Sequence, residues 1–101
     1  MNVLINATFQ VNDYLKSVIE EKVNKLKIHF DRITQAEIYL KIGENRHRHA
    51  EDQIVELRVS VPGYTFFAED HSDTFEKSVA GAADKVLQQI KKYKSKHYSH
   101  H

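Results

Sequence analysis

The sequence predicts a two-layer α+β domain with the element order β-α-β-β-β-α, a four-stranded sheet with two helices on one face. Segments 13–30 and 72–96 repeat apolar residues every three or four positions, as amphipathic helices do. Segments 36–42 and 53–61 alternate apolar and polar residues, as half-buried strands do. With 101 residues, 41% of them hydrophobic, and no cysteine, one core without disulfides is expected.

The first part of the chain is predicted to form a strand and then a helix. Residues 2–8 contain the apolar run Val3-Leu4-Ile5, which favours a strand. Asn12 is placed to cap the following helix. The apolar positions of that helix are Tyr14, Leu15, Val18, Ile19, Val23 and Leu26. Lys22 falls near the middle of this arc, either as a lysine along the edge of the core or as a cation held at a fixed place on the surface.

Three further strands are predicted before the second helix. The polar segment 43–52 separates strands 36–42 and 53–61 and is expected to be a hairpin loop. Pro62 and Gly63 form a turn that leads into a last strand at 64–68. We expect these strands to form an antiparallel meander.

The second helix, 72–96, is the best specified element. Its predicted core positions are Phe75, Val79, Ala82, Ala83, Val86, Ile90 and Tyr93. Ser72 or Asp73 is expected to cap it, and Gly81 weakens it by roughly 1 kcal/mol relative to alanine. A stripe away from the core is formed by Lys85, Gln89, Lys92 and Lys96. It is either a solvated surface or a row of phosphate contacts.

The net charge of +1 is distributed unevenly. Residues 46–90 contain five Lys/Arg and eight Asp/Glu, whereas residues 91–101 contain four lysines, three histidines and no acid. This asymmetry favours a polyanionic partner. Arg46 and Arg48, in the predicted hairpin loop, suit phosphate binding and stacking on exposed bases, although a plain solvated loop is the commoner case.

Catalysis has little support in the sequence. There is no cysteine nucleophile, no glycine-rich phosphate loop and no serine in a nucleophile elbow, so we predict no enzyme, no catalytic residue and no cofactor. His47 and His49 could bind a metal, but zinc sites usually need four ligands and the neighbouring arginines disfavour a cation. No apolar run reaches the ~20 residues of a membrane span, and no signal peptide is evident. A cytoplasmic protein is therefore expected.

Taken together, the chain resembles the ribosome hibernation-promoting factor family in its short form, which includes bacterial protein Y. In the second helix the matching residues are Asp84-Lys85-Val86, then Gln89-Ile90-Lys91-Lys92 and the lysine-rich end. In the first helix they are Lys22-Val23 and Lys25-Leu26. The resemblance covers nearly all of residues 1–96, expected to be a single ribosome-binding domain, with 97–101 a short, frayed histidine-rich tail.

The resemblance implies a fold similar to that of double-stranded-RNA-binding domains. It also implies a stoichiometric inhibitor that binds the 16S rRNA of the small ribosomal subunit in the decoding channel and silences idle ribosomes under stress and in stationary phase. The implied rRNA contacts are Lys22, Lys25, Lys85, Gln89, Lys92 and Lys96, with Lys94 a weaker candidate and Arg46 and Arg48 added for their chemistry.

No DNA or membrane partner is expected, and the protein is expected to be a monomer off the ribosome. Long members of the family carry a C-terminal dimerisation domain, and with 101 residues we expect this chain not to pair ribosomes by that route. Two alternatives stay open. One is a small protein-interaction module whose lysines only solubilise it, and the other is a metal protein that uses the histidine loop.

Overall fold

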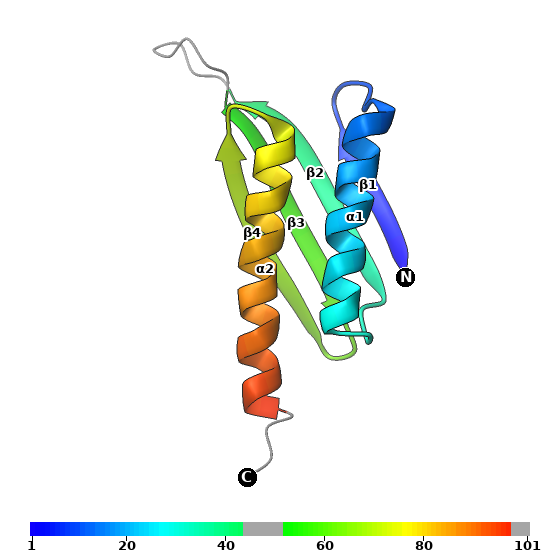
Figure 1. Cartoon of the computed structure of the whole chain (residues 1–101), viewed down its shortest axis with the longest axis vertical. Coiled ribbons are helices and arrows are strands. Elements are labelled where there is room, and N and C mark those ends of the chain that lie inside the picture. Colours follow the sequence, from blue (N-terminus) through cyan, green and yellow to red (C-terminus); the bar gives the residue numbers. More distant parts are fainter. Residues whose placement is uncertain (44–51, 98–101) are drawn as a thin grey trace.

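The computed structural model consists of a four-stranded sheet with two helices on one face (Figure 1), and it describes residues 1–43 and 52–97. The predicted α+β class and the order β-α-β-β-β-α are confirmed. The elements are β1 (Asn2–Ala7), α1 (Asp13–His29), β2 (Gln35–Gly43), β3 (Asp52–Val61), β4 (Tyr64–Ser72) and α2 (Phe75–His97).

The strands lie in the order β1-β2-β3-β4. β3 is antiparallel to both β2 and β4, as expected, but β1 is parallel to β2, so the prediction of a fully antiparallel meander is wrong at this strand. The reason is the crossover. α1 runs back along the sheet and returns the chain to the end where β1 began, so β2 must follow the direction of β1.

Strand β4 is longer than predicted. It continues from Tyr64 to Ser72, four residues beyond the predicted end at Ala68. The added residues are polar and show no apolar alternation, but their backbone keeps pairing with β3 as far as Ser72 opposite Gln53. Backbone pairing, rather than side-chain pattern, therefore sets the end of this strand.

Helix α1 begins as predicted. The Asn12 Oδ1 accepts a hydrogen bond from the Leu15 backbone N–H at 2.7 Å, which satisfies one of the unpaired donors of the first turn. Leu15 is 4% exposed and faces the sheet, whereas Tyr14 is 65% exposed, so its predicted place in the apolar arc is wrong. Adjacent helical residues differ by about 100° in direction. In α1 it is Leu15 that takes the core-facing direction, and Tyr14 points to solvent.

Helix α2 begins later than predicted and has a different cap. Ser72 still belongs to β4, and it is Thr74 whose side-chain oxygen accepts from the Lys77 N–H, at 3.2 Å. Asp73, the other predicted cap, instead pairs with Lys77 at 3.1 Å. Hydrogen bonds from Lys77 and then from Ser72 lower the pKa of the Asp73 carboxyl.

Two small residues bring α2 close to the sheet. Ser78 is fully buried and its hydroxyl donates to the Gln53 carbonyl oxygen at the start of β3, with the Thr74 carbonyl oxygen 3.1 Å away. A methyl group on Gly81 would overlap the carboxylate of Asp70 in β4. Glycine at this position therefore allows the close approach of α2 to β4.

The core lies between the helices and the inward face of the sheet. Six of the seven positions predicted for α2 are buried, and the seventh, Tyr93, is partly buried against the same core. In the sheet, the inward phase predicted for β2 and β3 holds except at Ile42, which is 48% exposed next to the end of β2. This packing fixes both helices relative to each other.

Candidate nucleic-acid interface

Both helices begin at the same end of the sheet and run in the same direction, so their C-terminal ends lie together beside the β3–β4 turn (Figure 1). Residues 22–32 contain four Lys/Arg and one acid, and residues 85–97 contain five lysines and no acid. We use the name basic end for the cations that lie from the middle of each helix onward, together with the one in the connection after α1: Lys22, Lys25, Lys27, Arg32, Lys85, Lys91, Lys92, Lys94 and Lys96. The lysines of the last turns, Lys27 in α1 and Lys94 and Lys96 in α2, also compensate the negative ends of two parallel helix dipoles.

Lys22 and Lys25 lie on the side of α1 that faces α2. With Leu26 they line a narrow groove whose other wall is formed by Ala83, Asp84 and Leu87. Lys22 is half-buried, which matches its interpretation as a lysine along the edge of the core, and Lys25 is exposed. Lys22 and Lys25 therefore lie together between the two helices. The predicted contacts Lys85 and Gln89 lie on the other side of α2, against β4.

Lys85 and Gln89 bind the edge of the sheet. The Lys85 Nζ donates to the Glu69 carbonyl oxygen at 2.8 Å and lies 3.3 Å from the Asp70 carboxylate. The Gln89 side-chain amide donates to the Phe67 carbonyl oxygen at 2.7 Å and accepts from the Phe67 N–H at 3.3 Å. Both side chains thus satisfy outward-facing backbone groups of β4, an edge strand. From the sequence, Lys85 and Gln89 were predicted only as rRNA contacts. Their bonds to the backbone of β4 were not predicted.

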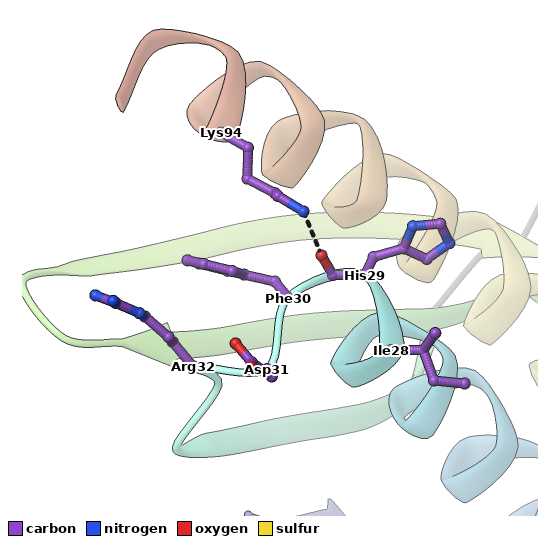
Figure 2. A pocket seen from close by; sticks show the side chains of 6 residues that line it. All are labelled: Ile28, His29, Phe30, Asp31, Arg32 and Lys94. Carbon is purple, nitrogen blue, oxygen red and sulfur yellow. Dashed lines mark hydrogen bonds between the residues drawn. The ribbon is translucent and has the colours of Figure 1, made fainter. Parts of the chain in front are cut away.

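Lys94 reaches from α2 to the end of α1 (Figure 2). Its Nζ donates to the His29 carbonyl oxygen at 2.7 Å, one of the carbonyls that a helix C-terminus leaves unpaired. The pocket around this bond has a volume of about 380 Å³ and is lined by Ile28, His29, Phe30, Asp31, Arg32 and Lys94. Arg32 is not among the predicted contacts, because nothing local in the sequence indicates that Lys94 lies near it.

Lys92 and Lys96 flank an aromatic hollow of about 260 Å³. Its walls are Tyr64, Gln89, Lys92, Tyr93 and Lys96. Tyr64, the first residue of β4, is 49% exposed, and its ring lies against that of Tyr93 with centroids 5.1 Å apart. Sequence reasoning missed Tyr64 as a surface feature. The only signal was an aromatic residue directly after the Pro62–Gly63 turn.

The predicted contact residues differ in whether the fold already uses them. Within residues 1–43 and 52–97, no hydrogen bond or ion pair engages the ammonium groups of Lys22, Lys25, Lys92 and Lys96, whereas those of Lys85 and Lys94 are engaged. Arg46 and Arg48 lie outside the described residues, as do the candidate metal ligands His47 and His49.

The resolved pKa shifts of Tyr39 and Lys41 belong to the other face of the sheet. A hydrogen bond to Glu56, and then the charge of that carboxylate, raises the pKa of Lys41. In the same way Glu37 raises the pKa of Tyr39, through a hydrogen bond and then its charge. Each of these shifts has a surface carboxylate as its leading cause, so neither indicates a catalytic centre.

No group of three or more His, Asp or Glu side chains in residues 1–43 and 52–97 is arranged to hold a metal ion. Neither α1 nor α2 combines the length and the apolar character that a membrane-crossing helix needs.

The fold and the basic end define a small α+β protein with a surface suited to a polyanion. The chain belongs to the Sigma 54 modulation protein / S30EA ribosomal protein family, whose model matches residues 5–98. Relatives of similar sequence are named ribosome hibernation promoting factors, so the resemblance predicted from the sequence is confirmed.

One such relative, from Deinococcus radiodurans, is 27% identical over 88 residues, which are 87% of this chain and 46% of that protein. Another, from Pseudomonas putida, is 27% identical over 90 residues, or 89% of this chain and 82% of the relative. The chain therefore spans about half the length of the first and about four fifths of the second.

Two solved structures share the fold. A ribosomal subunit interface protein from Coxiella burnetii superposes with a TM-score of 0.78 at 25% identity, covering 94% of this chain and 99% of that one. The N-terminal domain of protein Y from Thermus thermophilus gives a TM-score of 0.76 at 21% identity, covering 92% and 99%. At that identity the second likeness bears on the fold alone.

Proposed function

We propose that this protein is a ribosome hibernation factor that binds the small ribosomal subunit and silences it. The observation that carries the proposal is the basic end, in which two parallel helices of an S30EA-family chain and the connection after α1 gather nine Lys/Arg side chains, eight of them on the helices. A surface of this kind suits the closely spaced phosphates of folded RNA. The proposed partner is 16S rRNA along the decoding channel, and the proposed site of action is the cytoplasm.

Lys22, Lys25, Lys92 and Lys96 are the proposed principal phosphate contacts, because their ammonium groups are not engaged elsewhere in the described residues. Lys85, Gln89 and Lys94 are proposed secondary contacts, which would approach RNA while keeping their bonds to β4 and α1. Arg46 and Arg48 remain proposals from residue chemistry alone.

The proposed mechanism is occupation of the channel and involves no reaction. Residues 1–96 act as one binding unit, and inhibition is stoichiometric: each bound copy keeps messenger RNA and tRNA out of one small subunit. Off the ribosome the protein is proposed to be a monomer. Inhibition of translation in a cell-free system should therefore level off near one protein per ribosome.

Co-sedimentation with small subunits through a sucrose cushion tests the proposal. Binding should be strong at about 50 mM salt and largely lost at about 200 mM, because each phosphate contact contributes about −0.7 to −0.9 to the log–log salt slope. If the protein stayed in the supernatant at the lower salt concentration, the proposal would be wrong. The protein-interaction module would then be the better hypothesis.

A further inference from the structure

We propose that Tyr64 is a stacking platform for one unpaired RNA base, with Lys92 and Lys96 binding the phosphates on either side of that base. This inference rests on the proposed function and deepens it: the ligand is specified as a single-stranded nucleotide, in addition to a charged RNA backbone. It concerns the aromatic hollow beside the β3–β4 turn, whose two tyrosines, Tyr64 and Tyr93, are not among the predicted rRNA contacts.

The Tyr64 ring packs against two other rings and is still half exposed. It lies against Tyr93 with centroids 5.1 Å apart and planes 30° apart, and it makes an edge-to-face contact with Phe66, with centroids 4.9 Å and planes 67° apart. Phe66 is 1% exposed and so belongs to the core, whereas Tyr64 is 49% exposed. The ring is therefore supported by one buried and one partly buried aromatic neighbour, while about half of the surface of Tyr64 is open to solvent.

The backbone at Tyr64 is fixed as well. Tyr64 pairs with Val61 in the first rung of the β3–β4 ladder, immediately after the turn in which Gly63 has a φ of 81°. Glycine adopts this left-handed conformation without strain. A ring with fixed backbone and packed neighbours loses little conformational entropy when a ligand covers it, which favours binding.

The charges around the hollow select an anionic aromatic ligand. Lys92 and Lys96 are one helical turn apart on the same face of α2, and the lining contains no acidic residue. The fifth lining residue, Gln89, is occupied by its bonds to Phe67. An aromatic face next to two unengaged cations matches a base joined to phosphates, whereas an apolar peptide would leave both lysines without partners.

The ligand should be unpaired RNA. Bases within a duplex are already stacked on their neighbours, so their faces are not available to a protein ring, whereas bases in single strands, loops and bulges are. Stacking on an aromatic side chain is also tolerant of sequence, because every base has a π-face. The hollow should therefore distinguish single strands from duplexes but should discriminate weakly among bases.

Fluorescence anisotropy with labelled RNA tests this on the full chain. The probes are a single strand of about 12 nucleotides, an oligomer of the same length in which the bases are replaced by abasic sites, and a duplex of matched length. The wild-type protein should bind the intact strand more tightly than the abasic one. Tyr64→Ala should weaken binding to the intact strand by roughly 5- to 150-fold, the range for loss of one base–aromatic stack, with little effect on the other two probes.

Two further variants separate stacking from packing. Tyr64→Phe keeps the ring and should retain the preference for intact over abasic strands. Tyr64→Leu keeps apolar cover over Phe66 but lacks an aromatic face, and it should lose that preference while its thermal midpoint stays close to that of Tyr64→Phe. Because these substitutions remove no charge, the salt slope should not change.

The inference is overturned if Tyr64→Ala or Tyr64→Leu binds the intact strand within twofold of wild type, or if intact and abasic strands bind the wild type equally, including no binding of either. Failure of the proposed function looks different. Wild-type protein that pellets with small subunits but shows no base-dependent binding refutes only the stacking platform. A Tyr64-dependent preference for intact strands, in a protein that does not pellet, refutes only the ribosomal function.

Discussion

Gly81 lies in the interior of α2, where a glycine is unfavourable for helix formation, and the reason is its neighbour Asp70 in β4, the strand against which α2 packs. An added methyl group would overlap the Asp70 carboxylate, which lies 3.3 Å from the Lys85 Nζ in the structure. The side chain of Asp70 would then have to turn away and leave that ion pair. The loss in helix propensity is therefore balanced by close contact between α2 and β4.

Gly81→Ala should consequently have opposite effects in two backgrounds. In the wild type we expect no gain in the free energy of unfolding, or a loss, because the new methyl group displaces Asp70. In an Asp70→Ala background the same substitution should add about 0.5–1 kcal/mol, the intrinsic preference of a helix for alanine over glycine. Urea denaturation of the four proteins in this double-mutant cycle measures the difference. Equal effects in both backgrounds would show that Asp70 does not restrict this position.

Local residue patterns predicted the start of α1 and failed at the start of α2. At the start of α1 the predicted cap, Asn12, is the one observed. Before α2 the chain offers Ser72, Asp73 and Thr74 in succession. Which of them caps depends on where β4 stops pairing with β3, and this is a tertiary property that a local pattern does not contain.

The helices and strands could be predicted because their apolar residues recur with a clear period. The pairing of the strands was harder to predict from the sequence. The inward phase of Val55, Leu57 and Val59 follows directly from alternation and is observed. The parallel pairing of β1 with β2 follows from a crossover helix, which the meander model did not take into account. The bond of Gln89 to β4 was not predictable, since it joins residues 22 positions apart.

Gln89→Ala should weaken the contact between α2 and the edge of the sheet. The Phe67 N–H and carbonyl oxygen would lose their side-chain partners and exchange them for water. Because the site is open to solvent, we expect a loss of about 0.5–1.5 kcal/mol in the free energy of unfolding, the usual net value of such bonds. Amide hydrogen exchange at Phe67 should also become faster.

The neighbouring Gln88 provides a matched control, since it is the same residue type in the same helix and is exposed. Gln88→Ala should leave both the stability and the Phe67 exchange rate almost unchanged. If the two alanine variants behaved alike, the amide of Gln89 would contribute nothing to holding the edge of β4.

At the scale of the whole molecule, the basic end arises from topology. The lysines of each helix are visible in the sequence, but whether they gather depends on the relative direction of the two helices. The single crossover and the β2-β3-β4 meander place three strands between α1 and α2, which makes the helices parallel (Figure 1). An antiparallel pair would have put Lys25 and Lys96 at opposite ends.

Because the topology gathers these lysines, we expect ribosome binding to depend on where the lysines lie and not only on how many there are. The double variant Lys92→Ala/Lys96→Ala removes two charges from the basic end, and Lys16→Ala/Lys77→Ala removes two from the first turns of the helices. If the basic end is the contact surface, the first variant should reduce the steepness of the log–log salt dependence of small-subunit binding by about 1.4–1.8, since two phosphate contacts are lost. The second should keep the wild-type slope and shift the affinity only slightly, through the change in net charge that both variants share. Equal slopes in the two variants would mean that the protein responds to its total charge, and the lysines of the basic end would then have no special place in recognition.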